Sequence, residues 1–240
     1  MRILVVGSCG KKKRIQLPNP PSCKDLQTRK HLSKWKAHLP HSLLPARAMY
    51  TGPQHRELLN GIEGLRTIKG VEVDFFIVSA GFGVLNENEM IPSYECSFNN
   101  MKKKDILERA HALGFEGAFR HIFRKEYDLL YIALGKKYMV TLCSSLLQDV
   151  KGVVVVFHKM EPNLETLYVP SGGGAVKSFS KHGFKIHGVV GFKGDLLRIL
   201  SEYAAKQKNS YAELRSWMNS ENLKSLIYEL GGLDHKSSEI

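Results

Sequence analysis

Short apolar runs alternate along the chain with longer segments in which apolar residues recur every three or four positions. The short runs predict buried strands, and the spaced pattern predicts amphipathic helices. The predicted strands cover residues 3–6, 71–80, 128–133, 153–157, 167–170 and 186–190. The predicted helices cover residues 23–38, 53–66, 101–113, 115–125, 138–148 and 196–206, followed by a helical segment over 210–230 that breaks near Asn219. This alternation predicts a Rossmann-like α/β fold, with a mostly parallel central sheet and helices on both faces.

The alternation is not interrupted by a linker, so we expect a single domain over residues 1–232. It would include a basic loop and helix at 8–40 and a helical segment at 194–230, and residues 233–240 would form a flexible tail. A hydrophobic share of 43% suits a globular core. The longest strongly apolar run, 153–157, is far too short to cross a bilayer. With no signal-peptide pattern at the start of the chain, we expect a cytoplasmic protein with no membrane partner.

Positive charge is concentrated near the N-terminus. The net charge is +12, and residues 1–47 contain eleven Lys and Arg residues against one acid, Asp25. A second basic cluster covers 102–104, with Arg120, Arg124 and Lys125. A solubilising surface usually mixes both signs of charge, whereas a one-sided cationic segment is typical of proteins that bind phosphate backbones. DNA or RNA is therefore the expected partner.

Glycine-rich turns follow several predicted strands. They lie at residues 7–13, 79–83, 135–137, 172–174 and 191–195. In an open α/β sheet, ligands bind beyond the carboxyl ends of the strands, and glycine lets backbone amides approach an anion closely. Gly191, Lys193 and Gly194 precede a predicted helix and are candidates for phosphate binding. Neither a Walker A loop nor a complete dinucleotide-binding glycine motif is present.

Cys9 is the most reactive candidate side chain in the sequence. It follows the first strand and adjoins Lys11, Lys12, Lys13 and Arg14, whose charges favour a nucleophilic thiolate. No cysteine pair has zinc-ribbon or thioredoxin spacing, and we expect all four cysteines to be free thiols, with Cys143 in the core. The histidines His158, His182 and His187 show no metal-binding spacing, so neither a metal nor a cofactor is expected.

Four segments resemble motifs of the YaaA-like superfamily. Residues 7–13 are similar to its opening C-x-x-K strand and loop, and residues 45–52 are similar to its P-A-x-x-L-Y-x-G segment. Residues 78–84 resemble L-S-A-x-x-G-L, and Pro92-x-Tyr94 matches the proline and tyrosine that follow. This superfamily includes peroxide-stress proteins and domains related to archaeosine synthase and 7-deazaguanine DNA modification. The resemblance implies an α/β fold and a connection with nucleic acids or modified bases. Archaeosine-synthase-like domains carry Cys-Ser where this chain has Cys9-Gly10.

These observations favour an enzyme that acts on a base or an N-glycosidic bond of a nucleic acid, by modification, exchange or removal. Glu87, Glu89, Glu95 and Asp195 are acids near the predicted site, and Glu95 is the best placed to stabilise an oxocarbenium-like centre or activate water. Tyr50, Phe82 and Tyr94 are candidates for stacking on a base. The candidate catalytic residues are Cys9, Glu95, Tyr94 and Ser79. The candidate nucleic-acid or phosphate-binding residues are Lys11, Lys12, Lys13, Arg14, Arg47, Lys193, Gly191 and Gly194.

Two other functions stay open. The first is a non-catalytic DNA- or RNA-binding protein of stress or defence, which would bind in a salt-dependent manner and form no product. The second is an enzyme of small nucleotides or sugar phosphates, in which the basic segment is incidental.

Overall fold

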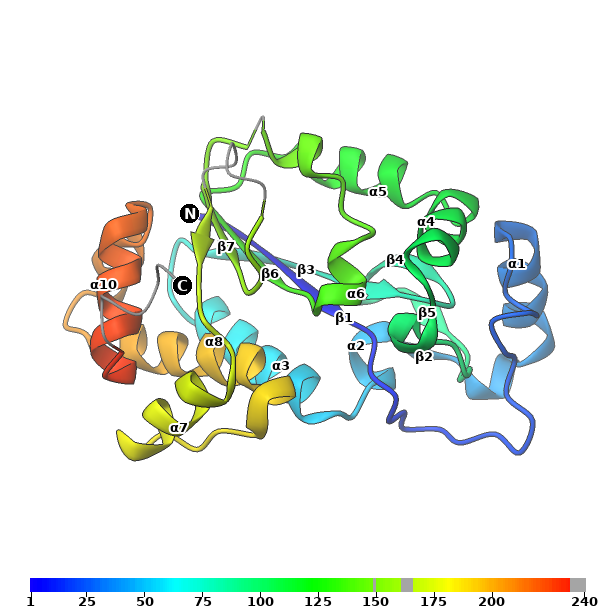
Figure 1. Cartoon of the computed structure of the whole chain (residues 1–240), viewed down its shortest axis with the longest axis horizontal. Coiled ribbons are helices and arrows are strands. Elements are labelled where there is room, and N and C mark those ends of the chain that lie inside the picture. Colours follow the sequence, from blue (N-terminus) through cyan, green and yellow to red (C-terminus); the bar gives the residue numbers. More distant parts are fainter. Residues whose placement is uncertain (149, 161–165, 234–240) are drawn as a thin grey trace.

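The computed structural model describes residues 1–148, 150–160 and 166–233. Its centre is a mostly parallel sheet of six strands in the order β4-β3-β1-β6-β7-β8 (Figure 1). The strands are β1 (Arg2–Ser8), β3 (Glu72–Ser79), β4 (Gly83–Asn86), β6 (Leu129–Ala133), β7 (Val153–Val156) and β8 (Leu167–Tyr168). Only β4 runs antiparallel to its neighbour within this sheet. The predicted α/β class with a mostly parallel sheet is therefore confirmed.

Helices lie on either side of this sheet in Figure 1, with α4 and α5 on one side and α3 and α8 on the other. The longer helices are α1 (Arg29–His38), α3 (Pro53–Arg66), α4 (Lys103–Ala112), α5 (Phe115–Ile122), α7 (Gly173–Lys181), α8 (Gly188–Lys206), α9 (Ser210–Ser216) and α10 (Ser220–Gly231). Two short helices, α2 (Ala46–Met49) and α6 (Lys136–Met139), and a small sheet of β2 (Leu44–Pro45) with β5 (Met90–Ile91) complete the main elements. None of the described helices is both long enough and apolar enough to cross a membrane.

Strand β1 determines where a ligand can bind. Its residues 3–6 are completely buried because β3 and β6 pair with both edges. The chain first passes from β1 to β3 on one side, and later continues with β6 on the other side. Such a reversal opens a crevice at the carboxyl ends of the two strands that flank it, here β1 and β6. Gly7 of β1 pairs in register with Ala133, the last residue of β6. Cys9, two residues further on, therefore lies just beyond the carboxyl ends of both strands.

Several predicted elements are confirmed. The helix α3 has the predicted bounds and begins at Pro53, which suits the first helical turn because proline lacks an N–H. Helices α4 and α5 are separated by Gly114, whose φ of 70° is the left-handed conformation that glycine adopts readily. The last helical segment breaks at Asn219, whose side chain caps α10, and it ends at Gly232 with a φ of 56°.

The predicted helix over 23–38 begins six residues late, at Arg29. The Ser22 backbone and side chain both donate hydrogen bonds to Asp25, which holds this region in a turn. Thr28 caps the helix by accepting the His31 N–H. No residue of α1 is fully buried, and only Leu32 and Trp35 pack against the core from this helix. The helix lies at one end of the molecule (Figure 1).

Three further sequence predictions are wrong. The helix over 138–148 is replaced by α6 and a single 3₁₀ turn, because the chain makes three-residue hydrogen-bonded turns after Tyr138. The strand over 186–190 is instead the start of α8, where the Asp195 carboxylate accepts the His187 N–H. No strand is predicted between residues 80 and 101, but this stretch contains β4 and β5, because Gly83, with a φ of 84°, lets the chain reverse after β3. Of the predicted tail at 233–240, Leu233 packs against the core, and residues 234–240 lie outside the described residues.

The two longest helices, α3 and α8, pack directly against each other. Gly61 of α3 makes this possible, since a Cβ atom there would lie 2.8 Å from the backbone nitrogen of Arg198 on α8. Gly194 of α8 plays the reciprocal role, because its Cβ would lie 2.3 Å from the backbone oxygen of Gln54. Both helices would have to move apart to accept a methyl group at either position.

We expect Gly61→Ala to lower the free energy of unfolding by about 2 kcal/mol, within the usual cost of overpacking a core. Gly117→Ala is the matched control, because Gly117 is an exposed helical glycine at which an added methyl group would have no atom within 4 Å. That change should be neutral or stabilising by up to about 1 kcal/mol. Urea unfolding followed by circular dichroism measures both values. Equal stability of the two variants would contradict the close packing of α3 against α8.

Candidate functional site

A polar cavity of about 500 Å³ lies beyond the end of β1. It is bounded by the segment after β1, by the loop that follows β5, and by α6. The residues that line it are Cys9, Gly10, Lys11, Lys13, Cys23, Glu95, Cys96, Ser97, Asn99, Asn100, Met101 and Tyr138. The cavity therefore occupies the crevice that the strand order predicts, and its size suits a ligand of nucleotide dimensions.

Cys9 and Tyr138 form a hydrogen-bonded pair in the wall of this cavity. The Cys9 Sγ lies 3.1 Å from the Tyr138 hydroxyl oxygen. Burial, with a further contribution from Cys9, raises the pKa of Tyr138 well above its usual value, so the phenol keeps its proton at neutral pH. It can therefore donate a hydrogen bond to a Cys9 thiolate. The Cys9 N–H in turn donates to the Val78 carbonyl, which fixes the residue against the end of β3.

Lys13 is the half-buried cation of the cavity. Burial lowers the pKa of its ammonium, while the neighbouring groups of Cys9 and Glu95 act in the opposite direction. The Lys13 Nζ lies 4.4 Å from the centre of the Tyr94 ring, within the range of a cation–π contact. Cys9, Glu95 and Lys13 thus place a nucleophile, a carboxylate and a cation around one space.

Tyr94 and Ser79 do not line the cavity but lie behind its wall. The Tyr94 hydroxyl is 2.8 Å from the Tyr50 hydroxyl and 2.7 Å from the Ser79 Oγ. The Ser79 Oγ also accepts the N–H groups of Gly81 and Phe82. All three aromatic rings proposed for base stacking, those of Tyr50, Phe82 and Tyr94, are buried, so they position the wall instead of offering a free face.

The basic segment after β1 is fastened to the rest of the protein at several points. Cys23 and Cys96 form a disulfide that joins residues 73 positions apart. Arg109 of α4 donates to the carbonyl oxygens of Ala80, Cys23 and Leu26 and so reaches from the end of β3 to this segment. The prediction of four free thiols is wrong for Cys23 and Cys96, and Cys143 is exposed rather than in the core.

Most of the predicted phosphate-binding cations near the N-terminus are accessible. Lys11, Lys12 and Arg14 are exposed, and Arg14 uses only its Nε, on the Ala48 carbonyl. Arg47 is different, because its guanidinium already pairs with the carboxylates of Glu63 and Glu87. Within the described part of the chain, no ion pair neutralises the basic residues Lys11, Lys12, Arg14, Lys24, Arg29, Lys30 and Lys34.

Gly191 and Gly194 do not form the predicted phosphate-binding loop. Both lie within α8 and are buried, and Gly194 packs against α3. Lys193, between them, is buried at the carboxyl ends of β6 and β7 and does not line the cavity of Cys9. The helical periodicity of α8 is masked in the sequence by its glycines and its two leading valines.

Of the four acids predicted near the site, Glu95 alone lines the cavity. Glu87 pairs with Arg47 and Arg66, and Glu89 pairs with Lys36.

The fourth acid, Asp195, belongs to a cluster between α3 and α8. One ligand atom each of Glu57, His187 and Asp195 lies within 4.8 Å of the others, a spacing that a metal ion could bridge. The Asp195 carboxylate is already bound by the His187 ring at 2.6 Å, and Arg198 pairs with Glu57 at 2.8 Å. We therefore interpret the cluster as an ion-pair network that joins the two helices.

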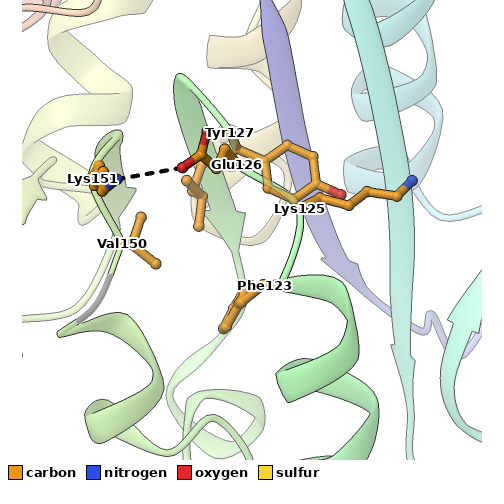
Figure 2. A pocket seen from close by; sticks show the side chains of 7 residues that line it. Phe123, Lys125, Glu126, Tyr127, Val150 and Lys151 are labelled. Carbon is orange, nitrogen blue, oxygen red and sulfur yellow. Dashed lines mark hydrogen bonds and ion pairs between the residues drawn. The ribbon is translucent and has the colours of Figure 1, made fainter.

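A smaller cavity of about 60 Å³ lies at the opposite, amino-terminal edge of β6. Figure 2 shows its polar rim, where Lys151 pairs with Glu126. The Tyr127 hydroxyl donates to Asp74 at 2.7 Å. This hollow can hold a few waters but no nucleotide.

Sequence reasoning missed Tyr138 as a site residue and missed the pairing of Cys23 with Cys96. A signal for Tyr138 was present, since it comes directly after the glycine-rich turn at 135–137 that follows β6. The disulfide had no sequence signal, because a pair 73 residues apart depends on the tertiary fold.

Comparisons with protein-family models, curated proteins and solved structures found no significant match. The class of the protein therefore rests on its own fold and site. It is an α/β protein with a cysteine-containing polar cavity at the carboxyl edge of a mostly parallel sheet.

The cysteine arrangement predicts the result of thiol counting. Unfolded, unreduced protein should incorporate two iodoacetamide groups, at Cys9 and Cys143, and reduced protein should incorporate four. In the folded protein, Cys143 should react first because it is exposed and Cys9 is buried. Peptide mass spectrometry locates each modification. Four modified cysteines without prior reduction would show that Cys23 and Cys96 are not joined.

Proposed function

We propose that this protein is an enzyme that acts on a base or an N-glycosidic bond of a nucleic acid. The observation that supports this proposal most directly is the cavity lined by Cys9, Glu95 and Lys13. It lies beside an exposed run of cations that form no ion pair with the described residues. The cavity would accept the base, and the basic segment would bind the phosphates.

The charge distribution supports a polyanionic partner. Lys11 lines the cavity, Lys12 and Arg14 continue the exposed cationic segment, and α1 adds further lysines at the end of the molecule. Cations that lack protein carboxylates as partners gain most from phosphate contacts, which release condensed counterions from the nucleic acid. The contacts of Arg109 and the Cys23–Cys96 disulfide hold this segment beside the cavity.

The resemblance to the YaaA-like superfamily gains support from the way its four segments meet. Lys13, from the first segment, forms an isolated antiparallel β-bridge through its backbone with Tyr50 of the second. Tyr50 contacts Tyr94 of the fourth, and Tyr94 contacts Ser79 of the third. The four separated motifs thus contact one another beside one cavity, which residues of the first motif line. Membership of the superfamily, with its connection to modified bases, is part of this proposal, as is the Rossmann-like character of the sheet.

The cavity residues have distinct roles in the proposed chemistry. The Glu95 carboxylate would stabilise positive charge at the sugar carbon or remove a proton from an attacking water. The Cys9 thiolate would attack the sugar carbon as the N-glycosidic bond breaks, and the base would leave with the bonding electron pair. The Tyr138 O–H would donate a hydrogen bond to the thiolate beforehand, and the Lys13 ammonium would supply a nearby positive charge. Tyr94 and Ser79 would be positioning residues, because they lie behind the wall and reach the cavity only through Tyr50 and Lys13.

Removing two phosphate-binding cations should weaken nucleic-acid binding in a salt-dependent manner. We expect Lys11→Gln with Lys12→Gln to lower the slope of log affinity against log salt by about 2 for duplex DNA. The control replaces Lys206 and Lys208 by Gln, because these exposed lysines lie at the far end of α8. Binding to duplex DNA, single-stranded DNA and transfer RNA is measured by fluorescence anisotropy over a salt series. Equal slopes for both double variants would remove the N-terminal segment from the interface.

Glu95→Gln should lower turnover by a factor of about 100 or more without weakening the binding of nucleic acid. The amide can neither remove a proton nor stabilise a positive charge. Glu126→Gln, at the opposite edge of the sheet, is the control and should keep full activity. Mass spectrometry of the recovered nucleic acid detects the product. A Glu95→Gln variant as active as the control would eliminate the catalytic role of this carboxylate.

The same experiment separates the two other functions. Binding without any change of mass in the three nucleic acids would favour a non-catalytic binding protein. Absence of binding at low salt, with thermal stabilisation by free nucleotides, would favour an enzyme of small nucleotides or sugar phosphates, which a cavity of about 500 Å³ can also hold.

A further inference from the structure

Lys193 occupies a second position on the carboxyl edge of the sheet, separate from the cavity of Cys9. Its neighbour Gly194 packs on Gln54, whose side-chain amide donates to the carbonyl of Ala133 at the end of β6. The Lys193 Nζ lies 5.8 Å from the centre of the Phe157 ring, directly after β7. Lys193 thus lies where β6 and β7 end, one strand further along than Cys9.

The Lys193 ammonium is buried without an anionic partner. The residue is 7% exposed, and its Nζ forms no ion pair or hydrogen bond with the described residues. Burial lowers the pKa of its ammonium. Asp195, two residues further on, is occupied by the N–H and the ring of His187. The weak contact with Phe157 does not replace the hydrogen bonds that a buried ammonium loses with water.

His158 presents a second unsatisfied group at the same place. Its Nε2 is buried and has no hydrogen-bond partner among the described residues. Burial and the charges of Lys193 and Lys136 lower the pKa of its ring. Lys136 is exposed and follows β6. Two lysine side chains, of Lys193 and Lys136, and the ring of His158 are thus brought to the carboxyl ends of β6 and β7.

We propose that Lys193 and His158 form a binding site for a phosphate group, with Lys136 at its outer edge. A phosphate would supply acceptors to the Lys193 ammonium and to an Nε2–H of His158, and would neutralise the surplus of positive charge. Lys11 and Lys13 line a different cavity, so phosphate bound there should not depend on Lys193 or shift the resonances of His158. The inference does not depend on the proposed nucleic-acid function, since inorganic phosphate is sufficient to test it.

The test is titration of the full chain with inorganic phosphate at constant ionic strength, followed by isothermal calorimetry. Lys193→Met should weaken phosphate binding at least tenfold, because it removes the buried charge and keeps an unbranched side chain. The control Lys206→Met, an exposed lysine on the same helix, should bind phosphate as the original protein does. Circular dichroism establishes that both variants are folded.

A second measurement needs no variant. With ¹⁵N-labelled histidine, the ring resonances of His158 should shift and saturate as phosphate is added, while those of His182, at the end of α7, should not. A saturating shift of His158 supports the site even where Lys193→Met does not fold. Unchanged His158 resonances, or equal phosphate affinity of folded Lys193→Met and Lys206→Met, would overturn the inference. The same titration with a nucleoside monophosphate shows whether the phosphate is accepted as part of a nucleotide.

Discussion

The burial of β1 between two parallel neighbours is the constraint from which the architecture of the site follows. Residues 3–6 of this strand are fully enclosed, so these four positions must be apolar, and its backbone groups pair with β3 on one edge and β6 on the other. The chain adds β3 on one side of β1 and later adds β6 on the other side. The loops that follow β1 and β6 therefore diverge and leave space at the carboxyl ends of these strands. Cys9 directly follows β1 and Tyr138 lies in α6, the first helix after β6, and their contact borders that space.

The second constraint is the attachment of a highly charged segment that has little core of its own. Helix α1 contributes no fully buried residue, and hydrophobic burial alone cannot fix its position. Its anchoring depends on directional contacts instead. Arg109 reaches three carbonyl oxygens, the Trp35 ring nitrogen donates to Asp25, and the disulfide joins Cys23 to the loop of Glu95. These contacts hold the segment in place and leave most of its cations without an ion pair to the described residues, Lys36 being paired with Glu89.

The sequence was informative where local pattern and tertiary burial agree. The run at 3–6, the proline at the start of α3 and the glycine between α4 and α5 each have one local solution, and the structure adopts it. Prediction failed where a contact distant in the chain decides the local structure. The start of α8 looks like a strand because two valines precede a glycine, but Val190 is 75% exposed and the Asp195 carboxylate holds the first turn. Among the candidate site residues, those adjacent to β1 could be placed from the sequence. The burial of Tyr94, the ion pairs of Arg47 and the disulfide required the fold.

The two cationic regions of the sheet edge differ in the physics of what they can do. Lys11 and Lys12 after β1 are exposed, so salt screens them and each contributes little orientation to a ligand. In the proposed function their effect would be to concentrate polyanions near the cavity. Lys193 is enclosed, so its charge is weakly screened and its position is fixed by the packing of α8 on α3. An enclosed cation selects the position of a single anionic group, whereas an exposed cationic segment selects only for total charge. If both proposals hold, one edge of the sheet attracts anions at long range through its exposed cations and positions one anionic group through Lys193. The glycines that let α3 and α8 approach each other fix the position of Lys193.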